Sequence, residues 1–505
     1  MSAERELRTL AIVNWRDPWH PEAGGAERYA WEMARWFAAR GTRVRFVTGR
    51  APGQAARERI EDVEIVRRGG RFTVYPLVLA WMLARRRAFD AVLDCQNGIP
   101  FFTPWVLPRR VPILCVVHHV HDGQFHLYFP AWLARLGRFL EGPVARRAYR
   151  RHACVAVSPS TVTAMRERLA WTGPVYLVPN GVIPPDTAPG PDGVTLSDAA
   201  PDAVTLSGAV SGPSSVTPPG AAPVLNGVTL PGTVPGPSGV TLSDTATGPG
   251  AVMSPDAASG LGAVAPPDAA PGPSGVTLSD AGPGPEGVSR PDAAPDPNGV
   301  TLSGAGLGPA GTDDEPELAC VSRLVPHKRV GRLLDVAERL RVRVHVIGRG
   351  PEEAALRAQV AARGLEELVV LHGYLPEEEK DALVARARIH LSASRGEGWG
   401  LSVAEAAAFG VPTVAYDVDG LRDAVVDGVT GWLVPEGEEL ADVIERALKE
   451  LSVPERRRET AAACRAWAAE FTWARSAERM AALLDAAVRR GTAQGLEDRS
   501  FPWPR

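Results

Sequence analysis

The chain has 505 residues, 45% of them hydrophobic, and a formal net charge of −4, which together describe an ordinary globular protein long enough for two or three domains. Five widely spaced cysteines, an odd number in no metal-ligand spacing, argue against a disulfide framework or a zinc site and favour a reducing compartment. With no signal-peptide pattern at the N-terminus and no apolar run approaching the ~18 residues that span a bilayer, we expect a cytoplasmic protein, at most peripheral to a membrane.

Residues 1–182 alternate short apolar runs with longer stretches of helical period, which is typical of a parallel α/β domain. The first strand is expected at 9–15, followed by a loop with paired glycines, a helix at about 26–40 and a strand at 43–48. Further buried strands are predicted at 89–95, 112–118, 151–158 and 175–181.

Residues 183–315 differ in kind from the rest of the chain. They contain no Phe, Trp, Tyr, Cys, Lys or His, and twelve Asp, two Glu and one Arg give them a net charge of −13, which leaves about +9 on the remainder. A degenerate dodecapeptide around GVTLSD repeats through them. We predict a disordered linker, since one Val and one Leu per repeat cannot bury a core; a β-solenoid is the alternative. The basic remainder suits a phosphate-bearing ligand or an anionic membrane, although solvated arginines would also explain it.

The strand and helix alternation resumes in residues 316–480, and residues 481–505 form a tail. Two such alternating segments joined by a linker predict two doubly wound domains facing a cleft, with the final helix packing back on the N-terminal domain. Strands are expected at 317–324, 343–350, 368–375, 388–394 and 412–417, helices at 327–340, 352–364, 378–387 and 402–410, and a mostly helical C-terminus after them.

Three clusters of residues carry candidate chemistry. Gly24 and Gly25 lie between a strand and a helix start, where backbone N–H groups can approach an anion, although a plain tight turn has the same pattern. Arg323 and Lys328 follow a strand at the sheet edge where α/β proteins bind ligands, and two cations there can converge on a diphosphate. The bland alternative is a solvated pair.

The third cluster is the glycine-rich segment SRGEGWGLSVAEAAAFGVP, residues 394–412. Glu397 and Glu405 stand eight residues apart on either side of an expected helix start. Free N–H groups at that start can hold phosphate oxygens, and the two carboxylates can accept hydrogen bonds from sugar hydroxyls. Glu405 could otherwise be an exposed helix residue, but a solvated Glu397 would not need such a loop.

In this order, Arg323 with Lys328, the Gly348-Arg349-Gly350 turn and the Glu397/Glu405 pair resemble the retaining GT-B enzymes of glycosyltransferase family four. AGGAE at 23–27, VSPST at 157–161 and VPNGV at 178–182 add to a resemblance that covers most of 7–182 and 316–480. It implies two Rossmann-like domains, an N-terminal acceptor domain and a C-terminal donor domain. The repeat linker departs from the family, which has a short connector there.

The resemblance also implies roles. A UDP- or GDP-sugar would be the donor, and a hexosyl group would pass with retention to a glycan, polyol or lipid-linked acceptor in cell-envelope synthesis, with no metal and no further cofactor. Arg323 and Lys328 would bind the pyrophosphate, Glu405 the ribose and Glu397 the sugar. The implied donor-binding positions are Gly24, Gly25, Arg323, Lys328, Gly348, Arg349, Gly350, Glu397, Gly400, Leu401, Ser402 and Glu405.

Histidines at the end of the strand 112–118 are candidates for the acceptor side. His118 or His119 could hydrogen-bond the transferring sugar or assist the acceptor hydroxyl; counting along the strand favours His118, but the doublet leaves both open. With His121 they could suggest a metal, yet no carboxylate or Cys matches their spacing. The D-x-D pattern at 417–419 is interpreted as a loop.

Two segments could contact a membrane: residues 72–87, apolar with three arginines at the end, and RRAYRR at 146–151. A core helix is the alternative for the first. Two other functions also remain open, a GT-B sugar-nucleotide epimerase and a non-catalytic scaffold that uses the repeat linker. We do not expect nucleic-acid binding.

Overall fold

The computed structural model describes residues 6–183, 185, 317–493, 496 and 503, all within one compact unit. The predicted disordered repeat linker lies outside these residues except for two positions at its start. Of the predicted tail, residues 481–493, 496 and 503 are described.

An eight-stranded sheet forms the N-terminal half of the described chain, in the order β3-β4-β2-β1-β5-β6-β7-β8. Every neighbouring pair is parallel except β3 with β4. The strands are β1 (Thr9–Val13), β2 (Arg43–Thr48), β3 (Arg57–Ile60), β4 (Val63–Arg67), β5 (Ala91–Asn97), β6 (Ile113–His119), β7 (Ala153–Ala156) and β8 (Val175–Leu177). The helices are α1 (Gly25–Ala39), α2 (Val74–Ala84), α3 (Phe125–Tyr128), α4 (Ala131–Phe139), α5 (Ala145–Ala148) and α6 (Pro159–Glu167).

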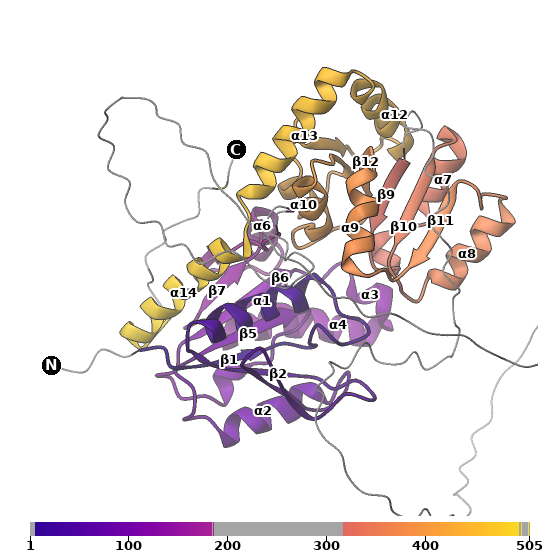
Figure 1. The fold of residues 1–505 in the computed structure, drawn as a ribbon. Coiled ribbons are helices and arrows are strands. Elements are labelled where there is room, and N and C mark those ends of the chain that lie inside the picture. The colour runs from indigo at the N-terminus through magenta and orange to yellow at the C-terminus, as the bar shows by residue number, and fades with distance from the viewer. Residues whose placement is uncertain (1–5, 184, 186–316, 494–495, 497–502, 504–505) are drawn as a thin grey trace, which may run out of the picture. The chain divides into compact units, whose positions relative to one another are not determined.

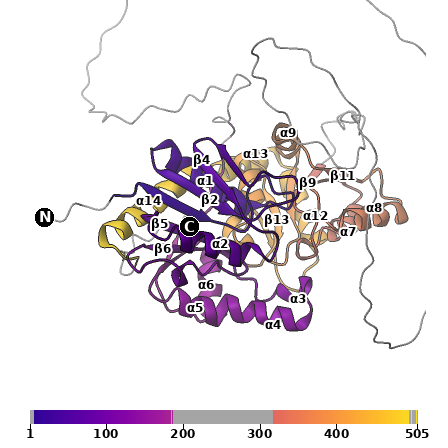
Figure 2. The same ribbon diagram turned by 90° about the horizontal axis from the view of Figure 1, so that it is seen from below.

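Both faces of this sheet are covered (Figure 1). Along β1, Leu10 and Ile12 join the apolar cluster that contains the buried side of α1. Ala11 and Val13 join the cluster that contains α2. This alternation along a strand buried on both sides is why the sequence shows a continuous apolar run there. Helices α3, α4 and α5 follow one another in a row along one side of the half (Figure 2).

The hairpin formed by β3 and β4 was not predicted. β3 is an exposed edge strand with the sequence RERI, so it has no apolar alternation to indicate a strand. Its turn residues Glu61 and Asp62 both have positive φ, 46° and 64°, as a two-residue hairpin turn of type I′ requires. This turn has Glu-Asp in place of the usual Asn-Gly or Asp-Gly, so the sequence carries no turn signal at this position.

A six-stranded sheet, parallel throughout, forms the C-terminal half in the order β11-β10-β9-β12-β13-β14. Its strands are β9 (Glu317–Val321), β10 (Arg343–Ile347), β11 (Val369–Gly373), β12 (Ile389–Ser392), β13 (Thr413–Tyr416) and β14 (Gly431–Val434). Its helices are α7 (Arg332–Leu340), α8 (Glu353–Ala362), α9 (Glu377–Arg386), α10 (Leu401–Ala408), α11 (Leu421–Ala424), α12 (Leu440–Leu451), α13 (Pro454–Ala469) and α14 (Trp473–Arg490). The two sheets with their flanking helices confirm the predicted pair of doubly wound α/β domains.

Two details of this half differ from the prediction. Strand β14 lies in the stretch that was expected to be mostly helical. The helix expected to start at His327 starts at Arg332 instead, after a 3₁₀ turn at Pro326–Lys328. Arg329, in the left-handed region at φ 50°, separates the turn from the helix.

The C-terminal segment connects with the N-terminal half at several points. Val182 pairs with Thr472 in an isolated parallel bridge, and α14 contacts α1 in a shared apolar cluster. The Tyr176 hydroxyl donates to the Leu496 carbonyl at 2.7 Å. Among the described residues, each helix is too short or too polar to cross a lipid bilayer.

A buried carboxylate organises the carboxyl end of β5. Asp94 is fully buried and accepts hydrogen bonds from the Thr103 hydroxyl at 2.6 Å, from the backbone N–H groups of Phe101 and Thr103 at 3.0 and 3.1 Å, and from the Tyr149 hydroxyl. Burial raises the pKa of Asp94, and these hydrogen bonds lower it only in part. The loop after β5 is thus held by a group that needs all of its donors.

Replacing Tyr149 by Phe should therefore destabilise the protein by about 1–3 kcal/mol, because it leaves a buried carboxylate short of one donor. Urea denaturation followed by tryptophan fluorescence measures this free energy. Tyr75→Phe is the matched control, since the Tyr75 hydroxyl has no hydrogen bond among the described residues, and it should change stability by less than about 0.5 kcal/mol. Equal stabilities of the two variants would contradict the role given to Asp94.

Candidate functional site

The loop that carries Arg323 is positioned by the glycines that follow β10. Gly348 has φ +139°, and a Cβ there would lie 2.0 Å from the Ser322 carbonyl oxygen. A Cβ on Gly350 would lie 2.2 Å from the Leu324 carbonyl oxygen. Only glycine allows these close approaches. The Gly-Arg-Gly turn named from the sequence therefore packs against the backbone on both sides of Arg323.

Across from Arg323 lie the paired glycines at the start of α1. A Cβ on Gly24 would come within 3.3 Å of Arg323 Nε, and one on Gly25 within 3.5 Å of Leu401 Cδ2. The Gly24 N–H donates to the Glu27 carboxylate at 2.8 Å, so the helix start is capped by its own side chain. The glycine loop of the N-terminal half thus meets the cation and the α10 start of the C-terminal half.

Lys328 and Glu397 form an ion pair. Their side chains are 16% and 18% exposed. Burial alone would raise the pKa of Glu397, but the Lys328 ammonium and its hydrogen bond hold that pKa below the usual value. The carboxylate is therefore ionised at neutral pH. The ion pair links the loop that follows β9 to the loop that follows β12.

The loop around Glu397 is in close backbone contact on two sides. A Cβ on Gly398 would lie 1.9 Å from the His118 carbonyl oxygen at the end of β6, and one on Gly420 2.4 Å from the Glu397 carbonyl oxygen. The Glu397 N–H donates to the Asp419 carbonyl at 2.9 Å. The glycines near Glu397 serve these approaches, one of which joins the two halves.

The two candidate histidines occupy different places. His119 Nδ1 lies 3.1 Å from the Glu397 carbonyl oxygen, which can only accept, so Nδ1 carries the proton; its Nε2 then accepts from the Gln124 amide at 2.9 Å. His118 packs edge-on against the Tyr29 ring, 5.1 Å between centroids, and its buried Nε2 has no hydrogen-bond partner among the described residues. Burial lowers the pKa of His119 well below its usual value and that of His118 to about 3, so both rings are neutral at pH 7.

Glu405 is paired with groups that the sequence did not single out. Arg28 Nη1 on α1 lies 3.0 Å from Glu405 Oε1 and 3.2 Å from Glu377 Oε1. Lys380 Nζ lies 4.0 Å from Glu405 Oε2 and 3.1 Å from the same Glu377 oxygen. Burial raises the pKa of Glu405 even though Lys380 and Arg28 oppose the shift. Arg28 is thus a second contact between the halves, and no motif indicates it because its partners are more than 300 residues away.

The start of α10 lies between these carboxylates in the sequence. Gly400 precedes the helix in the left-handed conformation, φ 89°. The first N–H groups of any helix, here those of Leu401 and Ser402, have no acceptor within the helix, and the helix dipole favours an anion beside them. Such a helix start is suited to binding phosphate oxygens.

The side chains of three other residues named from the sequence make contacts outside the Lys328–Glu397 pair. Arg349 is exposed, and its Nε would lie 3.6 Å from a Cβ at Gly373, at the end of β11. The two acids of the D-x-D pattern form separate ion pairs, Asp417 with Arg422 at 2.9 Å and Asp419 with Arg168 at 3.1 Å.

Each half of the chain matches a glycosyltransferase family model. Residues 23–184 match glycosyltransferase family 4, and residues 309–465 match glycosyl transferases group 1.

Two curated relatives illustrate the sequence similarity. Alpha-D-kanosaminyltransferase of Streptomyces kanamyceticus is 31% identical over 159 residues, which cover 30% of this chain and 41% of that protein. A GDP-mannose-dependent alpha-(1-6)-phosphatidylinositol monomannoside mannosyltransferase of Mycolicibacterium smegmatis is 35% identical over 188 residues, 34% of this chain and 49% of that protein. The matched residues thus span less than half of these relatives.

Solved structures share the fold over nearly the whole chain. The sucrose-phosphate synthase of Thermosynechococcus elongatus has a TM-score of 0.60 at 16% identity, covering 94% of this chain and 97% of that chain. An Anabaena protein, HepE, solved with UDP and glucose, has a TM-score of 0.54 at 14% identity, covering 95% and 100%. The matches in both halves and the shared GT-B fold show that the chain belongs to the group 1, family 4 glycosyltransferases.

Proposed function

We propose that the chain is a metal-independent, retaining hexosyltransferase that takes a UDP- or GDP-sugar and glycosylates a glycan, polyol or lipid-linked acceptor in cell-envelope synthesis in the cytoplasm. The Lys328–Glu397 ion pair, with Arg323 facing Gly24 across the two halves, carries this proposal. This arrangement brings positive charge and an ionised carboxylate close together. Transfer from a sugar diphosphate would use the positive charge for the leaving diphosphate and the carboxylate for the sugar.

The leaving diphosphate would be stabilised by Arg323, Lys328 and the N–H groups at the start of α10. An ammonium has three donors, so Lys328 can keep its contact with Glu397 and still donate to phosphate oxygens. Pre-positioned donors of this kind stabilise developing charge without rearranging, which is usually the largest catalytic contribution. Such donors could therefore support the chemistry without a metal.

The two carboxylates would contact the sugar and the ribose. Ionised Glu397 can only accept hydrogen bonds, which suits hydroxyl groups of the transferred hexose. Glu405 would accept from ribose hydroxyls, in competition with Arg28 for the same oxygen. No cofactor besides the donor is needed for these contacts.

His118 and His119 would act on the acceptor side by hydrogen bonding. Their lowered pKa values make both rings weak bases, so positioning of a hydroxyl suits them better than proton abstraction. His119 lies against the Glu397 loop, whereas His118 offers a buried nitrogen without a partner among the described residues.

Donor and acceptor classes are supported by what curated relatives are named for. One is named for GDP-mannose and a phosphatidylinositol mannoside, another for D-inositol 3-phosphate, and several as glycogen synthases. These acceptors are a lipid-linked sugar, a polyol and a glycan.

A peripheral membrane contact is supported by an exposed face on α4. Trp132, Leu136 and Phe139 are 66%, 44% and 56% exposed and stand at helical spacing, so they share one side of the helix, near Arg135 and Arg138. Exposed aromatic and aliphatic groups beside arginines suit an anionic bilayer surface. In the segment 72–87, by contrast, Val74, Val78, Trp81 and Met82 are buried in the core.

Glu405→Gln should weaken binding of the nucleoside diphosphate that wild type prefers by about 10–100-fold, because it removes a charged acceptor from the ribose. Isothermal titration calorimetry with UDP and GDP measures this. Arg28→Ala is the matched variant: it frees Glu405 of its partner, and the half-buried pair is worth little enough that affinity should change by less than about fivefold. Full affinity in Glu405→Gln would remove the ribose role.

Lys328→Met should reduce donor turnover by about 10²–10³-fold. As the pH falls, the residual activity should be lost at a higher pH than the activity of wild type. In wild type the lowered pKa of Glu397 keeps the carboxylate ionised as pH falls; without Lys328, burial dominates and that pKa rises. Hydrolysis of the nucleotide sugar across pH 4–9 reports both effects. Lys380→Met, which removes a cation near Glu405 instead, should leave the acid limb in place. An unchanged acid limb in Lys328→Met would refute the coupling.

The double variant Trp132→Glu/Phe139→Glu should lose at least about tenfold in affinity for phosphatidylserine vesicles, since each buried aromatic contributes roughly 1.5–3 kcal/mol. Co-sedimentation with vesicles measures this. Trp105→Glu is the control, because Trp105 is also exposed, at 60%, but lies outside α4. Equal loss in the control, or no loss in the double variant, would count against a membrane contact through α4.

A further inference from the structure

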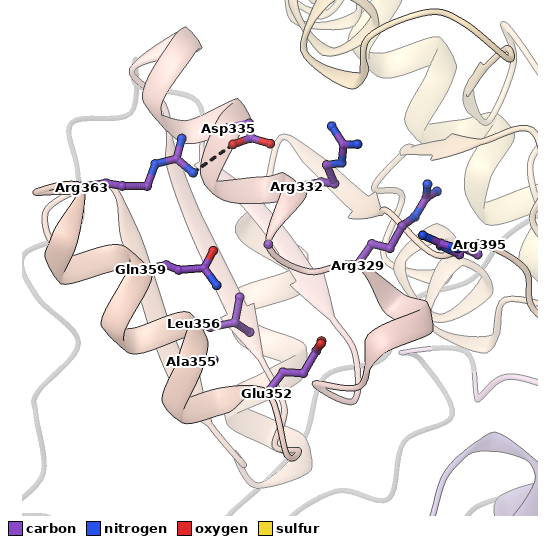
Figure 3. Close-up of a pocket in the computed structure, with 10 residues that line it drawn as sticks. Arg329, Arg332, Asp335, Glu352, Ala355, Leu356, Gln359, Arg363 and Arg395 are labelled. Carbon is purple, nitrogen blue, oxygen red and sulfur yellow. Dashed lines mark hydrogen bonds and ion pairs between the residues drawn. The ribbon is translucent and has the colours of Figure 1, made fainter. Parts of the chain in front are cut away.

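A cavity of about 430 Å³ lies between α7 and α8 in the C-terminal half (Figure 3). Four of the residues that line it are arginines and two are acidic. Its lining includes none of the positions assigned above to the donor. The cavity is therefore separate from the donor site, and its excess of positive charge favours an anionic ligand.

Arg329 is one of the residues that line this cavity. It follows Lys328 directly, and its left-handed φ of 50° turns the chain between the two residues. Lys328 pairs with Glu397, whereas Arg329 donates from Nε to the Ala393 carbonyl at 2.8 Å and from Nη2 to the Ser394 carbonyl at 3.2 Å. The two adjacent cations thus lie in different surroundings: Lys328 pairs with Glu397, and Arg329 lines the cavity.

The Arg329 guanidinium is held rigidly. Besides its two bonds to carbonyls, it stacks on the Tyr416 ring at 4.3 Å from the centroid. A guanidinium has five N–H donors, so donors remain for a ligand after these contacts. A pre-positioned, partly buried guanidinium loses little entropy when it binds an anion.

Two more arginines gather beside it without acidic partners. Arg332 and Arg395 are exposed, and neither forms an ion pair with any described residue. Figure 3 shows Arg395 next to Arg329, with Arg332 on the adjoining turn. Burial lowers the pKa of Arg329, and the nearby charges of Arg395 and Arg332 add to this shift. Like charges this close repel one another until an anion compensates them.

The acidic groups of the cavity do not provide this compensation. Asp335 pairs with Arg363 at 2.9 Å, on the far side of the cavity from Arg329 in Figure 3. Gln359 projects from α8, and Glu352 is the residue directly before that helix (Figure 3). Their oxygens can accept hydrogen bonds from hydroxyl groups. The guanidiniums of Arg329, Arg332 and Arg395 have no acidic partner among the described residues and are free to bind an anion.

We propose that this cavity is a binding site for a small phosphomonoester, with its phosphate on Arg329, Arg332 and Arg395 and its hydroxyl-bearing part against Gln359 and Glu352. A phosphomonoester offers a double charge and three acceptor oxygens, which match several guanidiniums better than a carboxylate does. The volume lies within the range of small-molecule sites.

Calorimetry on the full chain with glucose 6-phosphate, inorganic phosphate and glucose tests this. Wild type should bind glucose 6-phosphate and, more weakly, phosphate, while uncharged glucose should not bind. Arg332→Ala/Arg395→Ala should weaken glucose 6-phosphate binding by at least about tenfold, and Arg332→Lys/Arg395→Lys should recover part of it, since charge is kept but the planar fork is lost.

A second arm separates this cavity from the donor site, which could also take a phosphate. Lys328→Ala should leave glucose 6-phosphate binding intact, and Arg332→Ala/Arg395→Ala should leave UDP or GDP binding intact. Loss of glucose 6-phosphate binding in Lys328→Ala but not in the double variant would place the anion at the donor site and overturn the proposal. So would wild type that binds neither phosphate compound at millimolar concentration, whatever its affinity for nucleotides.

Discussion

The ion pair of Lys328 with Glu397 is the interaction on which the site depends. Taking two charges out of water is costly, and the cost is recovered only when their geometry is held closely. Here the ammonium follows β9 and the carboxylate follows β12, which are neighbours in the sheet although 69 residues separate the charged groups in sequence. The pairing of these strands therefore sets the distance between the charges, and the pair in turn keeps a buried carboxylate ionised.

Glycines make the surroundings of that pair compact. Gly348 and Gly350 let the backbone on either side of Arg323 approach β10, and Gly398 lets the end of β6 approach the Glu397 loop. Each of these contacts leaves no room for a Cβ. The site is thus built from backbone packed against backbone, with a few charged side chains added where the loops meet. Arg28 and Glu405 add a side-chain contact between the halves.

Much of this could be predicted from the sequence, because continuous apolar runs and helical periods indicate buried strands and covering helices. The strand-and-helix order and the main site positions followed from that pattern together with the family resemblance. What escaped prediction has physical reasons. The edge strand β3 is polar, and the irregular backbone at Arg329 has no residue type to mark it. The Arg28–Glu405 contact depends on how two distant helices meet, and local spacing contains no information on that.

The bridge between Val182 and Thr472 bears on how a GT-B chain can tolerate the long repeat segment, residues 183–315, between its halves. A Cβ on Gly181 would lie 2.2 Å from the Trp473 backbone nitrogen, so the last residues before the insertion are pressed against the point where the C-terminal segment returns to the first half. The polypeptide thereby connects its halves twice, once through the segment after Val182 and once through the C-terminal segment at Thr472. The second connection is held by its own contacts with the N-terminal half. Lengthening the first connection adds an entropic cost of loop closure that grows only with the logarithm of its length. The first connection could thus lengthen during evolution without any change in the contacts between the C-terminal segment and the N-terminal half.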